Sequence, residues 1–293
     1  MELPALQYHR PGSLAQACAL GRELGEGARF LAGGTDLLVD LKQRRVQVQH
    51  VIALDALEEL KPIRVEGGMV RIGALATLTD IAESAAVVEH APGLAEAIVT
   101  MAAVQIRNRA TIGGNFCAAV PCADTPPMCI AYGGSVRIVS STGDRVVPAE
   151  AFFLLPRRSV LEPGELLAEV LLPLRKAGRG AAYARFSRRR SMSLAVAAVA
   201  ARVDLDGGRV REARMAMTSV APTPMVASEA GAMLAGKEPT DDVIQRAARC
   251  AASEARPISD LRGSAEYRRD LVEVLAVRAL RWSIERARNG HGA

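Results

Sequence analysis

Two stretches of the sequence carry paired glycines where an anion could bind. Residues 31–38 read Leu-Ala-Gly-Gly-Thr-Asp-Leu-Leu, and residues 110–116 read Ala-Thr-Ile-Gly-Gly-Asn-Phe. Because glycine has no Cβ, its backbone can take positive φ and approach a ligand closely. A single Gly-Gly pair after a strand is more typical of an ordinary turn. The presence of two such stretches favours one extended ligand that both of them hold.

The first stretch also contains signals for the start of a helix. Thr35 or Asp36 could cap a helix over residues 37–42, whose free N–H groups and positive dipole end attract an anion. The two stretches therefore predict a phosphate-binding site in which backbone N–H groups face the ligand from two sides. The predicted donors are the N–H groups of Gly33, Gly34, Thr35 and Asp36 and those of residues 111–114.

Signatures of other chemistries are missing from the sequence. The four histidines are scattered, and there is no G-x-S-x-G elbow or Walker A loop. Neither glycine pair forms G-x-G-x-x-G, which disfavours a Rossmann domain. The five cysteines include no Cys-x-x-Cys pair and lack the spacing of an iron–sulfur site. We therefore predict no catalytic residue and no metal site, and expect a cofactor to carry the chemistry.

The two glycine stretches resemble those of a known family. The chain is similar to the FAD-binding (medium) subunit of the molybdenum hydroxylases, the carbon monoxide dehydrogenase and xanthine dehydrogenase family, which carries an A-G-G-x-[DS] loop and a T-I-G-G-N loop. The resemblance covers nearly the whole chain, including the run from Asp260 to Arg269. It implies FAD and an α+β fold, with a two-lobed FAD-binding domain of the PCMH (vanillyl-alcohol-oxidase-like) type. A C-terminal sheet-plus-helices domain of the CO dehydrogenase flavoprotein type would follow.

The resemblance also implies roles for polar residues near the cofactor. Since the carboxylate of Asp36 would repel a pyrophosphate, we assign this side chain to capping or to a sugar hydroxyl. Asn115 could bind the ribityl chain or stabilise its own turn. Asp124 could accept a hydrogen bond from a ribose or ribityl hydroxyl, or it could act only as a helix N-cap.

Two further assignments concern the flavin ring. The family has a basic residue near the flavin in a Tyr-x-[KR] setting, which Tyr183-Ala184-Arg185 matches. Arg185 would stabilise negative charge at the N1–C2=O edge of the reduced flavin, and the alternative is a solvated arginine on a strand. Leu166 or Leu167 would form the apolar wall of the ring. The predicted cofactor-binding residues are Ala32, Gly33, Gly34, Thr35, Asp36, Thr111, Ile112, Gly113, Gly114, Asn115, Asp124, Leu167 and Arg185.

Apolar periodicity and turn residues predict how these residues are positioned. We expect a first FAD-binding lobe over residues 1–57, a second lobe over 58–177 and a C-terminal domain over 178–293, with a linker at 176–180. Predicted strands cover residues 30–32, 51–54, 69–74, 135–140, 145–147, 166–172, 183–187, 194–205 and 210–220. Predicted helices cover residues 14–24, 37–42, 77–82, 92–103, 225–234, 241–253 and 267–287. Asp206-Gly207-Gly208 predicts a hairpin turn.

The resemblance further implies partner subunits. A small subunit with two two-iron two-sulfur clusters would pass electrons from a large molybdenum-cofactor subunit, which oxidises the substrate, to FAD in this chain. FAD would then reduce a terminal acceptor, and the assembly would be a heterotrimer that is often doubled. The alternative from another class is a non-catalytic assembly or binding module that has lost its flavin.

Composition limits the classes of partner and the cellular locations that we expect for this protein. The chain has 37 basic and 32 acidic residues among 293, a modest excess of +5 that is not gathered in one aromatic-interleaved patch. Nucleic acid is therefore not an expected partner. No apolar run approaches 18 residues, and the first residues do not resemble a secretory signal, so we predict no membrane span and a cytoplasmic protein.

Overall fold

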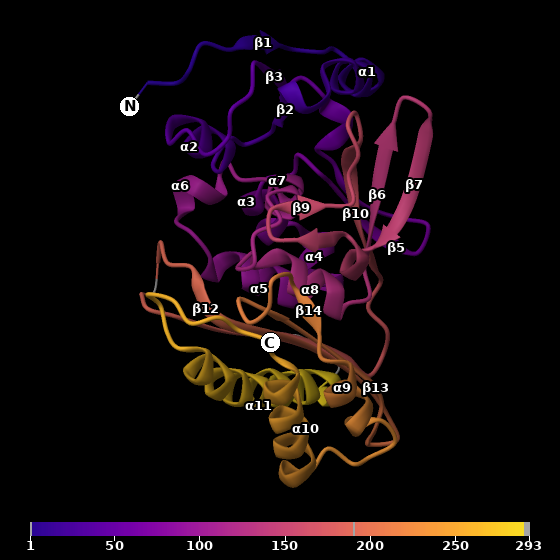
Figure 1. Ribbon diagram of the computed structural model, residues 1–293. Coiled ribbons are helices and arrows are strands. Elements are labelled where there is room, and N and C mark those ends of the chain that lie inside the picture. Colours follow the sequence, from indigo (N-terminus) through magenta and orange to yellow (C-terminus); the bar gives the residue numbers. More distant parts are fainter. Residues whose placement is uncertain (1, 190, 290–293) are drawn as a thin grey trace.

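The computed structural model describes residues 2–189 and 191–289. Figure 1 shows three stacked parts: a small N-terminal lobe, a central sheet with helices against it, and a C-terminal sheet backed by the last helices of the chain. The two glycine stretches lie in the first and second of these parts.

The N-terminal lobe is built on a parallel sheet of order β1-β3-β2. Its elements are β1 (Gln7–His9), α1 (Leu14–Leu24), β2 (Ala28–Leu31), α2 (Leu37–Lys42) and β3 (His50–Ala53), with short 3-10 turns at Gly25–Gly27 and Glu58–Leu60. The predicted bounds of both helices are confirmed, and Ser13 caps α1 by accepting a hydrogen bond from the Gln16 N–H at 3.3 Å. The short strand β2 delivers the first glycine pair to the start of α2.

The central part holds an antiparallel sheet of order β4-β5-β10-β6-β7. Its strands are β4 (Ile63–Glu66), β5 (Met69–Gly73), β6 (Ser135–Ser140), β7 (Gly143–Pro148) and β10 (Leu166–Pro173), and a small hairpin consists of β8 (Phe153–Leu155) and β9 (Arg158–Ser159). The helices are α3 (Leu78–Glu83), α4 (Ala85–His90), α5 (Pro92–Thr100), α6 (Val104–Arg107), α7 (Ile112–Cys117) and α8 (Thr125–Ala131), with a 3-10 turn at Ala149–Ala151. Alternate strand residues such as Val70, Ile72 and Val170 face the buried core that these helices share.

The predicted helix over residues 92–103 is shorter than expected. It ends at Thr100 because Ala102 has φ of 52°, in the left-handed region that a right-handed helix cannot continue through. The helical backbone starts again as α6.

The C-terminal domain is a sheet of order β11-β12-β13-β14 with three helices on one face (Figure 1). Its elements are β11 (Arg179–Ser187), β12 (Ala195–Asp206), β13 (Arg209–Thr218), β14 (Met225–Val226), α9 (Ser228–Leu234), α10 (Asp241–Glu254) and α11 (Ala265–Asn289). The hairpin turn is confirmed, since Gly207 and Gly208 have φ of 54° and 79° between β12 and β13. The predicted helices over residues 241–253 and 267–287 are also present.

Two predictions about this domain were wrong. The expected helix over residues 225–234 begins only at Ser228, because Met225 and Val226 instead pair with the edge of β13. The expected linker at 176–180 ends early, because β11 already starts at Arg179. The buried Arg179 donates to both carboxylate oxygens of Asp204 at 2.8 and 2.7 Å, a long-range pairing that local composition does not reveal.

Strand β12 joins the two halves of the molecule, because it is buried on both faces. Ala198 and Ala200 belong to the core of the central part, whereas Ala197 and Val199 belong to the core under α10 and α11. Small side chains on this sheet allow close approach of its neighbours. At Gly180 on β11, a Cβ would lie 1.9 Å from the Ser283 carbonyl oxygen of α11.

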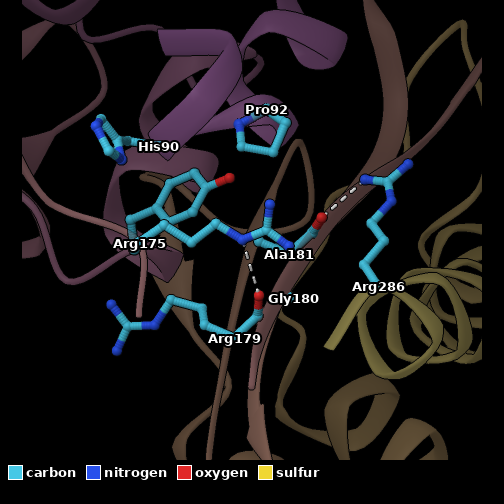
Figure 2. Close-up of a pocket in the computed structure, with 8 residues that line it drawn as sticks. His90, Pro92, Arg175, Arg179, Gly180, Ala181 and Arg286 are labelled. Atoms are coloured by element: carbon cyan, nitrogen blue, oxygen red, sulfur yellow. Dashed lines mark hydrogen bonds between the residues drawn. The ribbon is translucent and has the colours of Figure 1, made fainter. Parts of the chain in front are cut away.

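A small cavity lies between the central part and the C-terminal domain, beside Gly180 (Figure 2). It is lined by His90, Pro92, Tyr132, Arg175, Arg179, Gly180, Ala181 and Arg286, and its volume is about 10 Å³. This is close to the least space that a single buried water molecule needs. The cavity therefore cannot hold a dinucleotide, and it contains none of the predicted cofactor-binding residues.

Candidate functional site

The first glycine pair forms an open turn between β2 and α2. Gly34 has φ of 78°, which explains the need for glycine there. Within residues 2–189 and 191–289, no protein acceptor receives a hydrogen bond from the N–H groups of Gly33, Gly34, Thr35 or Asp36. Ala32 precedes them and packs against the apolar cluster that lies between the N-terminal lobe and the central sheet. The turn thus presents four consecutive N–H donors that are available to a ligand.

The predicted cap of α2 is wrong. Asp36 occupies the N-cap position, but its backbone has φ of −101° and ψ of −54°, and its side chain accepts no hydrogen bond from the helix. In the described part of the chain, Thr35 makes no capping hydrogen bond either. An extended N-cap conformation would be needed to turn a side-chain oxygen back onto the first N–H groups. No described side chain therefore caps α2, and the Leu38 N–H donates to the backbone carbonyl of Gly34 at 3.1 Å.

The second glycine pair lies inside a short helix. Thr111 caps α7 by accepting a hydrogen bond from the Gly114 N–H at 3.1 Å. The N–H groups of Ile112 and Gly113 donate to backbone carbonyls of Ala76 and Ala74, at 3.2 and 2.9 Å. Three of the four N–H groups that were predicted to hold a phosphate here already have protein acceptors.

The two stretches are in direct contact although their first glycines, Gly33 and Gly113, are 80 positions apart. A Cβ at Gly33 would lie 1.8 Å from the carbonyl oxygen of Arg109, immediately before the second stretch. A Cβ at Gly113 would lie 2.7 Å from Ala74, whereas a Cβ at Gly114 would meet only the hydroxyl of Thr111, at 3.1 Å. Gly33 and Gly113 are therefore required by packing, and Gly114 has an open side.

Two exposed side chains beside these stretches have raised pKa values. Asp36 and Cys117 are both exposed to solvent. The surrounding protein nevertheless raises the pKa of Asp36, and it raises the pKa of the Cys117 thiol to about 12.

Asn115 and Asp124 connect the second stretch to the C-terminal domain. Asn115 Oδ1 accepts from the Thr125 hydroxyl at 2.6 Å, so it supports the start of α8 rather than its own turn. Asp124 does not cap α8, which makes the N-cap reading wrong. Its carboxylate accepts instead from the Tyr183 hydroxyl at 2.8 Å and from Nε of Arg185 at 2.9 Å.

Arg185 is buried, which excludes the solvated alternative. Its side chain is 6% exposed, and its guanidinium also donates to the carbonyl of Ser193. Burial raises the pKa of Asp124, while the Arg185 guanidinium and the Tyr183 hydroxyl act in the opposite direction. A cation and a carboxylate are thus held together at the boundary between the central part and the C-terminal sheet.

Leu167 lies on β10, next to an irregularity in its pairing with β6. Leu167 is 4% exposed and belongs to the main core, whereas Leu166 belongs to the cluster between the central sheet and the N-terminal lobe. Both leucines are therefore packed within the protein.

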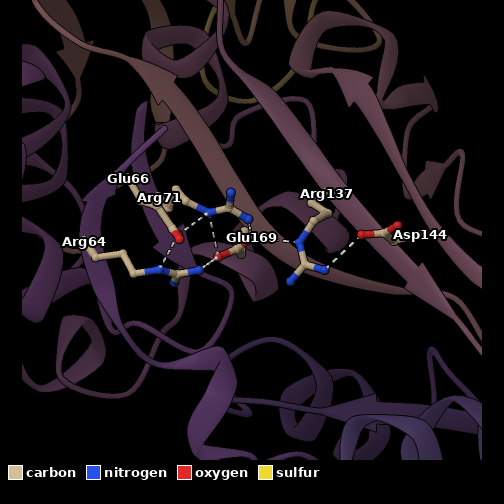
Figure 3. A network of polar contacts seen from close by, with 6 residues as sticks. All are labelled: Arg64, Glu66, Arg71, Arg137, Asp144 and Glu169. Atoms are coloured by element: carbon tan, nitrogen blue, oxygen red, sulfur yellow. Dashed lines mark hydrogen bonds and ion pairs between the residues drawn. The ribbon is translucent and has the colours of Figure 1, made fainter. Parts of the chain in front are cut away.

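The sheet beneath the second stretch is held by an ionic network (Figure 3). Glu169 on β10 is 2% exposed and contacts Arg64 on β4, Arg71 on β5 and Arg137 on β6. Nη2 of Arg64 lies 2.8 Å from Oε1, and Nε of Arg137 lies 2.7 Å from Oε2. Burial would raise the pKa of Glu169, but the hydrogen bonds from Arg71 and Arg137 outweigh it and lower the pKa to about 2. Helix α7 packs against β10, so the network stabilises the sheet on which the second glycine stretch lies.

One polar contact near the first stretch was not predicted from the sequence. Nη1 of Arg157, in the turn between β8 and β9, donates to Oδ2 of Asp40 on α2 at 2.7 Å. The two residues are 117 positions apart, and neither lies in a recognisable motif, so no sequence signal could have paired them. Among the described residues, no three His, Cys, Asp or Glu side chains gather as a metal site, and no helix is long and apolar enough to cross a membrane.

The fold and the two glycine stretches define a flavoprotein domain joined to a second, smaller domain. A family model described as the FAD binding domain in molybdopterin dehydrogenase matches residues 4–175, and a model of the CO dehydrogenase flavoprotein C-terminal domain matches residues 181–283. The chain belongs to this family of FAD-binding subunits of molybdenum-containing dehydrogenases. The expected α+β fold class and the FAD cofactor are thereby confirmed.

Individual relatives agree with this assignment. The chain is 37% identical to the carbon monoxide dehydrogenase medium chain of Hydrogenophaga pseudoflava, over 94% of this chain and 96% of that one. It is 31% identical to the xanthine dehydrogenase FAD-binding subunit of Escherichia coli O157:H7, over 93% and 94%. A chain of the reconstituted CO dehydrogenase from Oligotropha carboxidovorans superimposes with a TM-score of 0.95 at 35% identity, covering 98% of this chain and 100% of that chain.

Proposed function

We propose that this chain is the electron-transferring flavoprotein subunit of a molybdenum hydroxylase complex, with FAD bound between the two glycine stretches. Bound FAD would accept electrons from iron–sulfur clusters of a partner subunit and pass them to a terminal acceptor. The observation that carries the proposal is the open turn of Gly33 to Asp36. Its four N–H groups have no acceptor among the described residues, and Gly33 packs against the carbonyl of Arg109, just before the second glycine pair.

The residues present fit a dinucleotide cofactor. The free N–H groups of the first turn would donate to the pyrophosphate, and the open side of Gly114 would admit it from the second stretch. The carboxylate of Asp36 would face a sugar hydroxyl. The buried pair of Asp124 and Arg185 would lie toward the flavin ring, where Arg185 would hold negative charge on the reduced ring. Leu167 would contact the ring only at the edge of the core.

The proposed partners are a small subunit with two two-iron two-sulfur clusters and a large molybdenum-cofactor subunit, in a heterotrimer that is doubled. The relatives are named for complexes that act on different substrates, carbon monoxide in one case and xanthine in another. Substrate choice would then lie in the large subunit. We propose residues 1–57, 58–177 and 178–293 as the two lobes and the C-terminal domain; the last four residues of the chain lie outside the described residues.

We also propose a cytoplasmic location. All five cysteines are free thiols, as expected where disulfides are kept reduced. The alternative function, an assembly module that has lost its flavin, has less support, because such a module would have no need to keep four N–H groups free at a glycine turn.

Reduction of the isolated chain tests the proposal. The purified protein is loaded with FAD under anaerobic conditions, and its visible flavin absorption is followed. Dithionite should bleach this absorption, whereas carbon monoxide, purines and aromatic heterocycles should not, because activating these substrates needs the metal centre of the large subunit. Failure to bind FAD would favour the assembly module. Bleaching by a substrate alone would make this chain a substrate-oxidising enzyme in its own right.

A further inference from the structure

The turn between β8 and β9 carries Arg157 in a left-handed backbone conformation. Its φ is 62°, which is uncommon for a residue other than glycine. Its N–H donates to the carbonyl of Ala119 at 2.8 Å, two residues beyond the end of α7. The turn is therefore fixed to the helix of the second glycine stretch, and the Arg157 side chain starts from a fixed position.

From this position the side chain crosses to the N-terminal lobe. Nη1 of Arg157 donates to Oδ2 of Asp40 at 2.7 Å, and Nη1 of Arg45 lies 3.6 Å from the other carboxylate oxygen. The Asp40 side chain is only 10% exposed. Asp40 lies one helical turn after Asp36, so this ion pair links the second lobe to the helix that follows the first glycine pair.

Two carboxylates thus stand beside a turn that would hold a phosphate. A pyrophosphate would add further negative charge next to Asp36 and Asp40, which is unfavourable without a nearby cation. The surrounding protein and the Asp40 carboxylate raise the pKa of Asp36, and the Arg157 guanidinium opposes them. The charge of Arg157 therefore reaches the first turn as well as its direct partner.

Arg157 has donors left for a second acceptor. Its side chain is 53% exposed, and within the described residues its one side-chain hydrogen bond is that from Nη1 to Asp40. A guanidinium carries five N–H donors in a planar fork that matches phosphate oxygens. The donors not used by Asp40 meet no acceptor in residues 2–189 and 191–289 and can serve an anion.

We propose that Arg157 positions the first glycine turn and supplies the positive charge that lets the FAD pyrophosphate bind beside Asp36 and Asp40. This inference rests on the proposed function and adds a residue from outside both glycine motifs. In effect, the second lobe contributes its cation to the phosphate site of the first.

The test measures FAD dissociation constants of the full-length apoprotein by quenching of FAD fluorescence. Arg157→Gln should weaken FAD binding by about tenfold, since one charge-assisted interaction is lost. Arg157→Lys should stay within about threefold of the unmodified chain because the charge remains. The matched control is Arg145→Gln, which breaks a comparable pair with Glu165, 2.7 Å long and 42% exposed on the arginine, and should leave the FAD affinity unchanged.

The dependence of FAD affinity on salt distinguishes an effect of the Arg157 charge from a purely structural role of this residue. The FAD affinity of Arg157→Gln should fall less steeply with added NaCl than that of the unmodified chain. If Arg157→Gln folds poorly, the double variant Asp40→Asn, Arg157→Gln, which leaves no unpaired carboxylate, should fold and show the same shallow dependence. Unchanged affinity with unchanged salt dependence would overturn the inference, as would a lysine variant as weak as the glutamine variant. Failure of the unmodified chain to bind FAD would instead contradict the proposed function.

Discussion

The two glycine stretches look alike in the sequence but differ in the structure. The first is an open turn with four N–H groups that have no acceptor in the described residues. The second is a helix whose first N–H groups are taken up by Thr111, Ala76 and Ala74. The first stretch therefore keeps donors that a ligand could use, whereas three of the four predicted donors of the second stretch already have protein acceptors.

The two stretches show that glycine can be present at a position for two different reasons. Gly33 and Gly113 are glycines because neighbouring backbone leaves no room for a Cβ. Gly114 makes a weaker demand on the fold, since a Cβ there would meet only the capping hydroxyl of Thr111, at 3.1 Å. Substitutions at the two kinds of position should therefore have different effects on stability and on FAD binding.

The largest effect is expected at Gly33. Gly33→Ala places a methyl group 1.8 Å from the Arg109 carbonyl oxygen, so the contact between the stretches must open. We expect a loss of about 3 kcal/mol or more, roughly 10 °C in melting temperature, together with loss of FAD binding. Gly27→Ala is the control, because a Cβ there meets nothing within 4 Å. Equal melting curves for the two variants would show that the stretches need not touch.

At Gly114 a substitution should affect FAD binding without lowering the stability of the apoprotein. Gly114→Ala should leave the apoprotein as stable as before, or more stable by up to about 1 kcal/mol, because alanine is the better helix former. FAD affinity should fall by about a hundredfold, since the methyl group fills the open side that the pyrophosphate would use. Thermal melting and FAD titration of the same sample measure both. An unchanged FAD affinity would place the cofactor away from this glycine.

The stability of the sheet that supports the second stretch should decrease at acid pH. Because the pKa of Glu169 falls from 4.5 to about 2 on folding, its contribution is fully present above pH 4.5 and is lost as the pH falls toward 2. The difference corresponds to about 3 kcal/mol. Glu169→Gln should remove this part of the acid dependence, as measured by urea unfolding of the apoprotein between pH 3 and 7. A variant with the same pH profile as the unmodified chain would contradict the role of this carboxylate.

The smallest effect concerns Arg185. Replacing it by methionine should lower the flavin reduction potential by roughly 30 mV, because the reduced flavin loses a stabilising cation. The single variant also leaves Asp124 buried without its cation, so the Asp124→Asn, Arg185→Met double variant is measured beside it. A redox titration of the FAD-loaded proteins provides the value. An unchanged potential in both variants would confine Arg185 to a structural role.

Features governed by near neighbours in the chain were determined by the sequence alone. The glycine pairs, the family and its cofactor, the helices α1 and α2 and the hairpin at Gly207 and Gly208 all depend on residues a few positions apart. Hydrogen bonds of helices and turns connect such residues, so composition and spacing suffice to predict them.

The tertiary structure decided which of these residues are free to act. Whether the N–H of Gly113 is available depends on the carbonyl of Ala74, and whether Asp124 caps a helix depends on Arg185, 61 residues away. The pairing of Arg157 with Asp40 likewise joins two lobes. These contacts form because the packing of sheets and helices brings distant segments together, and a hydrogen-bonding group takes the partner that burial places nearest.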